Sequence, residues 1–316
     1  MKISTVIATY NSAATIAATL ESVLQQTVAP DEIVVLDDGS TDDTLSILRS
    51  YASRTRVIPG KHEGVAAARN ALCKSARGDL IAFLDSDDIW HPTYLERQIG
   101  LFAKYPKAVA FFTGHVDFRG KGKYEWEERL PDGPAADELM DSVLFFKRYN
   151  TSTGTFGSMS YCCVPQSVIQ RMNGEPFQTN GADDFYFLNW ALLSGPVVYD
   201  ARPLVAYRIA EGSISSDRVV NYGERVRAFE LLQERYAESS HPGLIAEFKK
   251  AFASHRRLFS KYLMGAGETA KARTQLKCAL LTSGSISAIA KSTMMFSLTY
   301  MPSAFQPKWP ARYRQT

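Results

Sequence analysis

The chain has 316 residues, of which 45% are hydrophobic and 22% are charged. This is the composition of an ordinary globular protein, and it excludes a predominantly disordered chain. The net charge is +3, but residues 241–316 hold twelve Lys and Arg against two acids, which gives +10 there and −7 for residues 1–240. The basic end indicates an anionic partner, either a membrane surface or a phosphorylated acceptor, or else a solvated helical face.

The cysteines and the apolar segments bear on localisation. Cys73, Cys162, Cys163 and Cys278 have the spacing of neither a zinc site nor a disulfide framework. The N-terminus runs straight into a strand-like pattern without a cleavable signal, and Lys291 and Pro302 make the apolar stretch 286–305 a poor membrane span. We therefore expect a cytoplasmic protein without a nucleic-acid partner, whose basic end either packs on the rest of the protein or lies peripherally on the inner face of a membrane.

The first 90 residues alternate between strand and helix patterns. Apolar runs at 3–8, 32–36, 56–58 and 80–84 predict four strands, each followed by a segment with helical spacing. Such steps predict an α/β fold with a doubly wound, mainly parallel sheet flanked by helices. Because the pattern beyond residue 216 is helical, we expect a catalytic domain at 1–215 and a helical C-terminal region with a basic tail at 216–316.

Polar residues follow the first, second and fourth predicted strands, as Tyr10-Asn11, Asp37-Asp38 and Asp85-Ser86-Asp87-Asp88. In a parallel sheet these loops open on one edge, where ligands bind. Two carboxylates about 5 Å apart repel by roughly 3 kcal/mol, which a divalent cation of the Mg²⁺ or Mn²⁺ type would remove. Alternatively, Asp87 or Asp88 caps a helix over 92–101. No G-x-G-x-x-G follows the first strand and no P-loop motif occurs, so neither of those nucleotide sites is supported.

Residues 6–11, 32–42, 64–70 and 83–88 together resemble, in this order, the motif series of family 2 inverting glycosyltransferases, which have the GT-A fold. The resemblance implies that the nucleotide-diphosphate part of a sugar donor is bound by Ala8, Tyr10, Asn11, Asp38, Arg69, Asp85 and Arg208. It also implies that Asp87 is the direct metal ligand and that Asp85 contacts both the ribose and the metal. For Tyr10 and Arg69 the alternatives are a packed aromatic and a surface helix residue.

A second acidic stretch contains Asp183 and Asp184. By the same resemblance Asp184 is the general base that takes the proton from the acceptor hydroxyl, and Asp183 stands where the family usually has Glu. Both acids also suit the first turn of a helix, which does not conflict with a catalytic role. Further on, Arg208 and Ser213 are candidates for a lid over the diphosphate, although a salt bridge is the alternative for Arg208. Ala210 stands where many relatives carry His.

The resemblance implies a metal-dependent, inverting glycosyltransferase that moves a sugar, most simply from a UDP-sugar, to a hydroxyl of a saccharide or lipid-linked acceptor in surface polysaccharide or glycoconjugate synthesis. Trp126 is either a platform for an acceptor sugar or an anchor for its loop. Two other functions stay open. One is a catalytically silent nucleotide-sugar-binding protein, and the other is a haloacid-dehalogenase-like phosphatase, which also places Asp-x-Asp after a strand.

Overall fold

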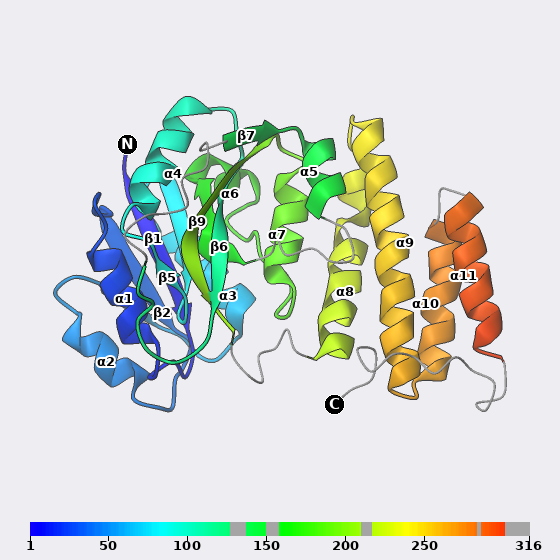
Figure 1. Ribbon diagram of the computed structural model, residues 1–316, viewed down its shortest axis with the longest axis horizontal. Coiled ribbons are helices and arrows are strands. Elements are labelled where there is room, and N and C mark those ends of the chain that lie inside the picture. The colour runs from blue at the N-terminus through cyan, green and yellow to red at the C-terminus, as the bar shows by residue number, and fades with distance from the viewer. Residues whose placement is uncertain (127–136, 150–157, 210–216, 283–285, 301–316) are drawn as a thin grey trace. The chain divides into compact units, whose positions relative to one another are not determined.

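The computed structural model describes residues 1–126, 137–149, 158–209, 217–282 and 286–300 (Figure 1). The chain forms two compact units, Met1–Ser142 with Gly157–Ala210 and Val143–Phe156 with Glu211–Thr316. The domain boundary expected after residue 215 falls within 210–216, outside the described residues, so that division stays a prediction. Ala210 and Ser213 lie in the same gap.

The first unit is built on one mixed sheet (Figure 1). Its described strands are β1 (Ile3–Thr9), β2 (Glu32–Asp37), β3 (Arg56–Pro59), β4 (Leu80–Asp85), β5 (Ile89–Trp90), β6 (Ala110–Phe118), β7 (Asp137–Met140), β8 (Cys162–Pro165) and β9 (Val197–Arg208). They run in the order β3-β2-β1-β4-β8-β6-β9-β5, with β7 paired to β9. The neighbours among β1 to β4 are parallel, as are β6 and β9, whereas β5, β7 and β8 pair antiparallel. This mainly parallel sheet confirms the predicted fold class.

Successive residues of a strand face opposite sides of the sheet, so the apolar strands expose two faces that helices cover. The helices of this unit are α1 (Ile16–Leu24), α2 (Thr44–Ser50), α3 (Val65–Ser75), α4 (Tyr94–Lys104), α6 (Gln166–Arg171) and α7 (Asp183–Ala191), with a 3₁₀ turn at Met159–Tyr161. Leu84 of β4 belongs to the core shared with apolar residues of α1, α2 and α4. Its neighbour Phe83 instead packs on Phe177 and on Phe187 of α7.

The helix expected over 92–101 is α4, which begins at Tyr94 with Thr93 at its N-cap. Strand β5 separates Asp87 and Asp88 from that helix. The alternative that either acid caps it is therefore wrong, because the chain pairs with β9 before it turns into the helix.

The loop before α3 depends on a glycine. Gly64 has a φ of +95°, and its N–H donates to Asp38 Oδ2 at 2.8 Å. A Cβ at this position would lie 2.6 Å from the side-chain amide of Asn180. Any other residue would therefore be strained and would also displace Asn180.

The second unit is helical, as the sequence predicts beyond residue 216. It contains α8 (Arg218–Ala237), α9 (Pro242–Gly265), α10 (Thr269–Thr282) and α11 (Ile286–Leu298), together with α5 (Ser142–Tyr149) apart from its first residue. Rings of Phe229, Phe248 and Phe252 pack together in its core. None of the helices in the described ranges combines the length and the apolar character needed to span a bilayer.

His255 of α9 is a buried titratable group in this core, where it is 1% exposed and its Nδ1 lies 2.9 Å from the carbonyl oxygen of Ala251. Burial, reinforced by the charge of Arg225, lowers the pKa of His255 to about 4. The folded protein therefore holds this imidazole neutral at pH values where the unfolded chain protonates it.

We expect Gly64→Ala to lower the free energy of unfolding by about 1–3 kcal/mol, because this φ is strained for a residue with a Cβ. Gly100→Ala is the matched control, since Gly100 lies in α4 and an added Cβ there would meet no atom within 4 Å. Alanine favours helix, so Gly100→Ala should be neutral or stabilising. Urea unfolding of the two variants makes the comparison, and equal stability in both would contradict the role given to Gly64.

A second prediction concerns the stability of the protein at low pH. Because the pKa of His255 is lower in the folded state than in the unfolded chain, its contribution is complete above pH 6.5 and is lost as the pH falls towards 4. Between pH 7.5 and 5.0 this group alone should cost about 2 kcal/mol of unfolding free energy. Urea unfolding at the two pH values should show a smaller loss in His255→Phe than in the wild type. A substitution of the exposed His241 by Phe is the control. If His255→Phe lost as much unfolding free energy between the two pH values as the wild type does, the assignment would be refuted.

Candidate active site

The carboxyl ends of β1, β2 and β4 lie side by side. Ala8 near the end of β1 is in register with Leu36 of β2 and with Asp85, the last residue of β4. Tyr10 follows β1 directly and Asp38 follows β2. The structure therefore brings Ala8, Asp38 and Asp85 to the same edge of the sheet, as the parallel pairing predicts.

Hydrogen bonds join the loops at this edge. Asp38 donates its N–H to the carbonyl oxygen of Thr9, and its carboxylate accepts from the N–H groups of Glu63 and Gly64 at 3.0 and 2.8 Å. Asn11 adds a second link, because its Oδ1 accepts from the N–H of Thr41 at 2.8 Å. Both residues hold the loops after β1, β2 and β3 in place, a role that the sequence analysis did not assign to them.

Tyr10 is 42% exposed and stacks on His62, with ring centroids 4.2 Å apart and ring planes 29° apart. Sequence reasoning singled out Tyr10 but missed His62. The only signal in the sequence for His62 was its position two residues before Gly64. An exposed aromatic face beside a polar loop suits a planar ligand such as a nucleotide base.

Arg69 of α3 lies between two acidic segments. Its guanidinium donates to Asp85 Oδ1 at 2.5 Å and also to Asp183 in the first turn of α7. Arg69 is 7% exposed and Asp183 is 6% exposed. The surface alternative for Arg69 is therefore wrong. The other oxygen of Asp85 accepts from the hydroxyl of Ser158 at 3.1 Å.

The turn after β4 concentrates negative charge. Burial, with the neighbouring charge of Asp85, raises the pKa of Asp87 to about 6. Burial and the charges of Asp87 and Asp85 raise the pKa of Asp88 well above its usual range. Asp88 accepts the N–H of Arg208 at 2.8 Å through Oδ1, while no side chain or backbone group of the described residues makes a hydrogen bond of ordinary geometry to its buried Oδ2.

This donor set fits a hard divalent cation, because carboxylate oxygens are its preferred ligands and a cation would offset the burial and the repulsion from Asp85 that raise the pKa of Asp87. Across the described ranges, however, no three Asp, Glu, His or Cys side chains converge to hold a metal by themselves.

Arg208 at the end of β9 is used within the fold. Its Nε donates to the carbonyl oxygen of Asp87 at 2.6 Å, and its other guanidinium nitrogens donate to the carbonyl oxygens of Gly120 and Gly122. The guanidinium carbon also lies 4.3 Å from the ring centroid of Phe118. Arg208 thus ties the acidic turn to the loop after β6.

Asp184 lies in the first turn of α7 and is partly buried, with Oδ1 accepting from the N–H of Phe185 at 2.6 Å. Arg69 is close enough for the charge of Asp184 to contribute to a raised pKa of that guanidinium. Asp183, the residue next to Asp184, is therefore connected through Arg69 to Asp85, although more than 90 residues of sequence separate the two acids.

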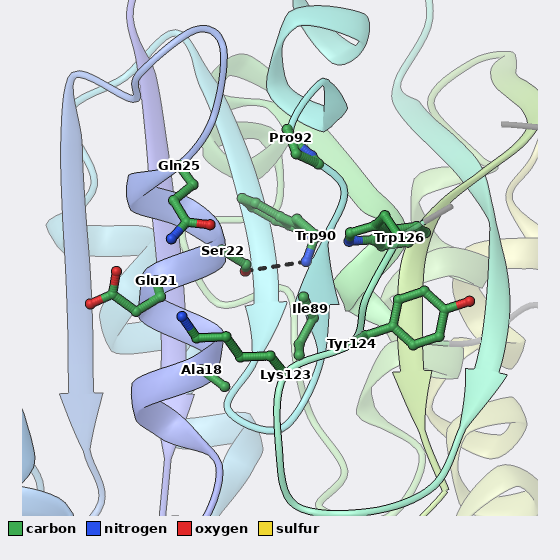
Figure 2. Close-up of a pocket in the computed structure, with 10 residues that line it drawn as sticks. All are labelled: Ala18, Glu21, Ser22, Gln25, Ile89, Trp90, Pro92, Lys123, Tyr124 and Trp126. Atoms are coloured by element: carbon green, nitrogen blue, oxygen red, sulfur yellow. Dashed lines mark hydrogen bonds between the residues drawn. The ribbon is translucent and has the colours of Figure 1, made fainter. Parts of the chain in front are cut away.

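A small hollow of about 60 Å³ is lined by α1, β5 and the loop after β6. Figure 2 shows Trp90, Tyr124 and Trp126 among the residues around it. The ring of Trp126 packs edge-on against the rings of His91 and Tyr124, with ring centroids 5.0 and 4.8 Å apart. These contacts favour the reading of Trp126 as an anchor for its loop.

The sequence is similar to those of known proteins. The model of Glycosyl transferase family 2 matches residues 4–172. The Escherichia coli UDP-Glc:alpha-D-GlcNAc-diphosphoundecaprenol beta-1,3-glucosyltransferase WfgD is 40% identical over 117 residues, 36% of this chain and 46% of that protein. The alignment thus spans less than half of that relative. An uncharacterized glycosyltransferase of Nostoc sp., alr2836, is 34% identical over 243 residues, 76% of this chain and 71% of its own.

Solved structures show the same fold. S. aureus TarS 1-349 in complex with UDP-GlcNAc superposes with a TM-score of 0.70 at 18% identity, covering 95% of this chain and 90% of TarS. The mannosyltransferase PcManGT from Pyrobaculum calidifontis, in complex with GDP-Man and Mn²⁺, gives a TM-score of 0.61 at 18% identity, with 99% and 84% covered. Because the family match covers more than half of the residues, this chain belongs to glycosyl transferase family 2 and has its GT-A-like fold.

Proposed function

We propose that this protein is an inverting, metal-dependent glycosyltransferase. It takes a sugar from a nucleotide-diphosphate donor and transfers it to a hydroxyl of a saccharide or lipid-linked acceptor in surface polysaccharide or glycoconjugate synthesis. The observation that carries the proposal is that one buried arginine bonds both Asp85 of the acidic turn Asp85–Asp88 and Asp183, the residue next to Asp184. Donor and acceptor chemistry need these two groups of carboxylates side by side.

The donor belongs at the strand ends. Tyr10 offers its exposed ring to the base, next to the loops that Asn11 and Asp38 hold together. A UDP-sugar is the favoured donor, because the name of WfgD specifies UDP-Glc and TarS was solved with UDP-GlcNAc. The GDP-Man bound to PcManGT makes a GDP-sugar the alternative. Arg208 acts here by holding the acidic turn.

Asp87, assisted by Asp85, would hold Mg²⁺ or Mn²⁺, and PcManGT supports this choice with its Mn²⁺. When bound, the ion neutralises charge that develops on the leaving diphosphate. Asp85 is oriented for this task because Arg69 and Ser158 fix both of its oxygens.

Asp184 accepts the proton of the acceptor hydroxyl as that oxygen bonds to the anomeric carbon from the side opposite the diphosphate. The bond to the diphosphate breaks, the configuration inverts, and no covalent enzyme intermediate forms. The rigid first turn of α7 holds the carboxylate at the required place.

The acceptor is proposed to be lipid-linked, as the name of WfgD specifies for that relative. Residues 241–316, with their charge of +10, suit the anionic inner face of a membrane or an acceptor diphosphate. Peripheral association of that basic region in the cytoplasm would bring the enzyme to such an acceptor.

Two alternatives are weaker. A haloacid-dehalogenase-like phosphatase has no support, because the chain belongs to family 2. A nucleotide-sugar-binding protein without catalysis would not need a carboxylate at position 184, but Asp184 is present at the start of α7. Donor binding without turnover over a broad panel of acceptors would favour this second alternative.

Asp184→Asn tests the proposal. We expect transfer to a GlcNAc-diphosphate lipid analogue to fall by about 10²- to 10⁴-fold, because the amide cannot accept the proton. Calorimetric affinity for the donor should stay within about twofold, since the change leaves its charged contacts in place. Glu175→Gln is the control, because that acid lies before α7 and forms an exposed ion pair with Lys74. Full transfer activity in Asp184→Asn would sink the assignment of the base.

A further inference from the structure

Besides the exposed ion pair of Lys74 with Glu175, helix α3 is bonded at three places to α7 or to the segment that leads into it. The N–H of Ala66 donates to Asn180 Oδ1 at 3.1 Å. Asn70 donates from Nδ2 to the carbonyl oxygen of Phe177 at 2.8 Å, and its Oδ1 accepts the N–H of Phe177 at 3.0 Å. One turn of α3 away from Ala66, Arg69 donates to Asp183. These bonds fix the backbone on the N-terminal side of α7.

The Arg69 contact is the strongest of the three. Both Arg69 and Asp183 are more than nine-tenths buried, so neither charge is stabilised by bulk water. Removing one member of such a pair leaves the other buried and uncompensated. A planar guanidinium also bonds two carboxylates at defined angles, which the single ammonium of lysine does not. Arg69 therefore fixes the position of Asp183 relative to Asp85.

Asp183 is covalently joined to Asp184 within the first helical turn. On the same helix Phe187 packs on Phe83 and Phe177, which limits rotation of α7 about its axis. With one end bonded to α3 and one face packed on β4, the backbone at position 184 has little freedom. A displacement of about 1 Å at a reacting group can cost about 100-fold in rate.

We propose that Arg69 and Asp183 are positioning residues that hold the base Asp184 in register with the donor-binding turn at Asp85. This inference rests on the proposed function, because it takes Asp184 as the base. It assigns Arg69 a role different from the nucleotide contact that the resemblance implies. Asn70 supports the same arrangement through Phe177.

Different substitutions can break the contact of Arg69 with Asp183 alone or its contacts with both Asp183 and Asp85. Asp183→Asn weakens only the link to α7, so kcat should fall by about 10- to 100-fold while donor affinity stays within about threefold. Arg69→Gln releases Asp85 as well, so kcat should fall and donor affinity should weaken by more than about fivefold. Asp183→Glu keeps the charge and should recover kcat to within about fivefold of the wild type.

Lys74→Ala is the matched control. Lys74 is on α3 and forms an ion pair with Glu175 of the same facing segment, but both side chains are more than half exposed. Exposed pairs contribute little, so kcat and donor affinity should stay within about twofold of the wild type. Asn70→Ala is a second variant that leaves no buried charge, and it should lower kcat by about 3- to 10-fold without weakening donor binding.

Turnover is measured as UDP-sugar hydrolysis, in which water replaces the acceptor, and as transfer to the lipid analogue. Donor affinity is measured by calorimetry, and hydrogen exchange of residues 177–191 reports whether α7 loosens. We expect faster exchange there in Asp183→Asn and Asn70→Ala but not in Lys74→Ala.

Wild-type kcat in Asp183→Asn, or a loss confined to donor affinity, would overturn the inference. If that variant does not fold, Asn70→Ala decides in the same way. Inactive Asp184→Asn beside fully active Asp183→Asn and Asn70→Ala would overturn the positioning role and leave the proposed function standing. Active Asp184→Asn would overturn the proposed base itself.

Discussion

The candidate site depends on one buried cation, the guanidinium of Arg69 between Asp85 and Asp183. Like charges gather at this edge of the sheet, and burial raises the pKa of Asp87 and of Asp183. Removing one partner of a buried ion pair costs about 3–5 kcal/mol. The arginine therefore does more than neutralise charge, because its two directed bonds set the distance between the acidic turn and the start of α7.

The same edge is stabilised by loops that share hydrogen bonds. Asp38 and Asn11 join segments that follow three neighbouring strands, and Gly64 allows its backbone to approach Asp38. Arg208 ties the acidic turn to the loop after β6. Each of these bonds joins parts of the chain that are distant in sequence, so together they hold the loops of the site against one another. Such preorganisation is what in-line sugar transfer requires.

Local patterns predicted the parallel half of the sheet and the helices, because apolar periodicity depends on near neighbours. They did not predict that β8 inserts antiparallel beside β4, since a short apolar strand carries no signal of its direction. The partners of Arg69 were also invisible, because Asp183 lies 114 residues away. The sequence drew attention to residues within the family motifs, but not to His62 and Ser158, which lie outside those motifs. Proximity to strand ends is a topological property, and specific side-chain bonds require coordinates.

The central claim is that the edge formed by β1, β2 and β4 binds a nucleotide-sugar donor through Asp87 and a divalent cation. Thermal unfolding of the wild type and of Asp87→Ala, with UDP, GDP, dTDP and CDP sugars and with or without Mn²⁺, tests it most directly. The account predicts a rise in Tm for one nucleotide class that needs Mn²⁺ and disappears in the variant. No rise with any donor, or an equal rise in Asp87→Ala, would contradict it.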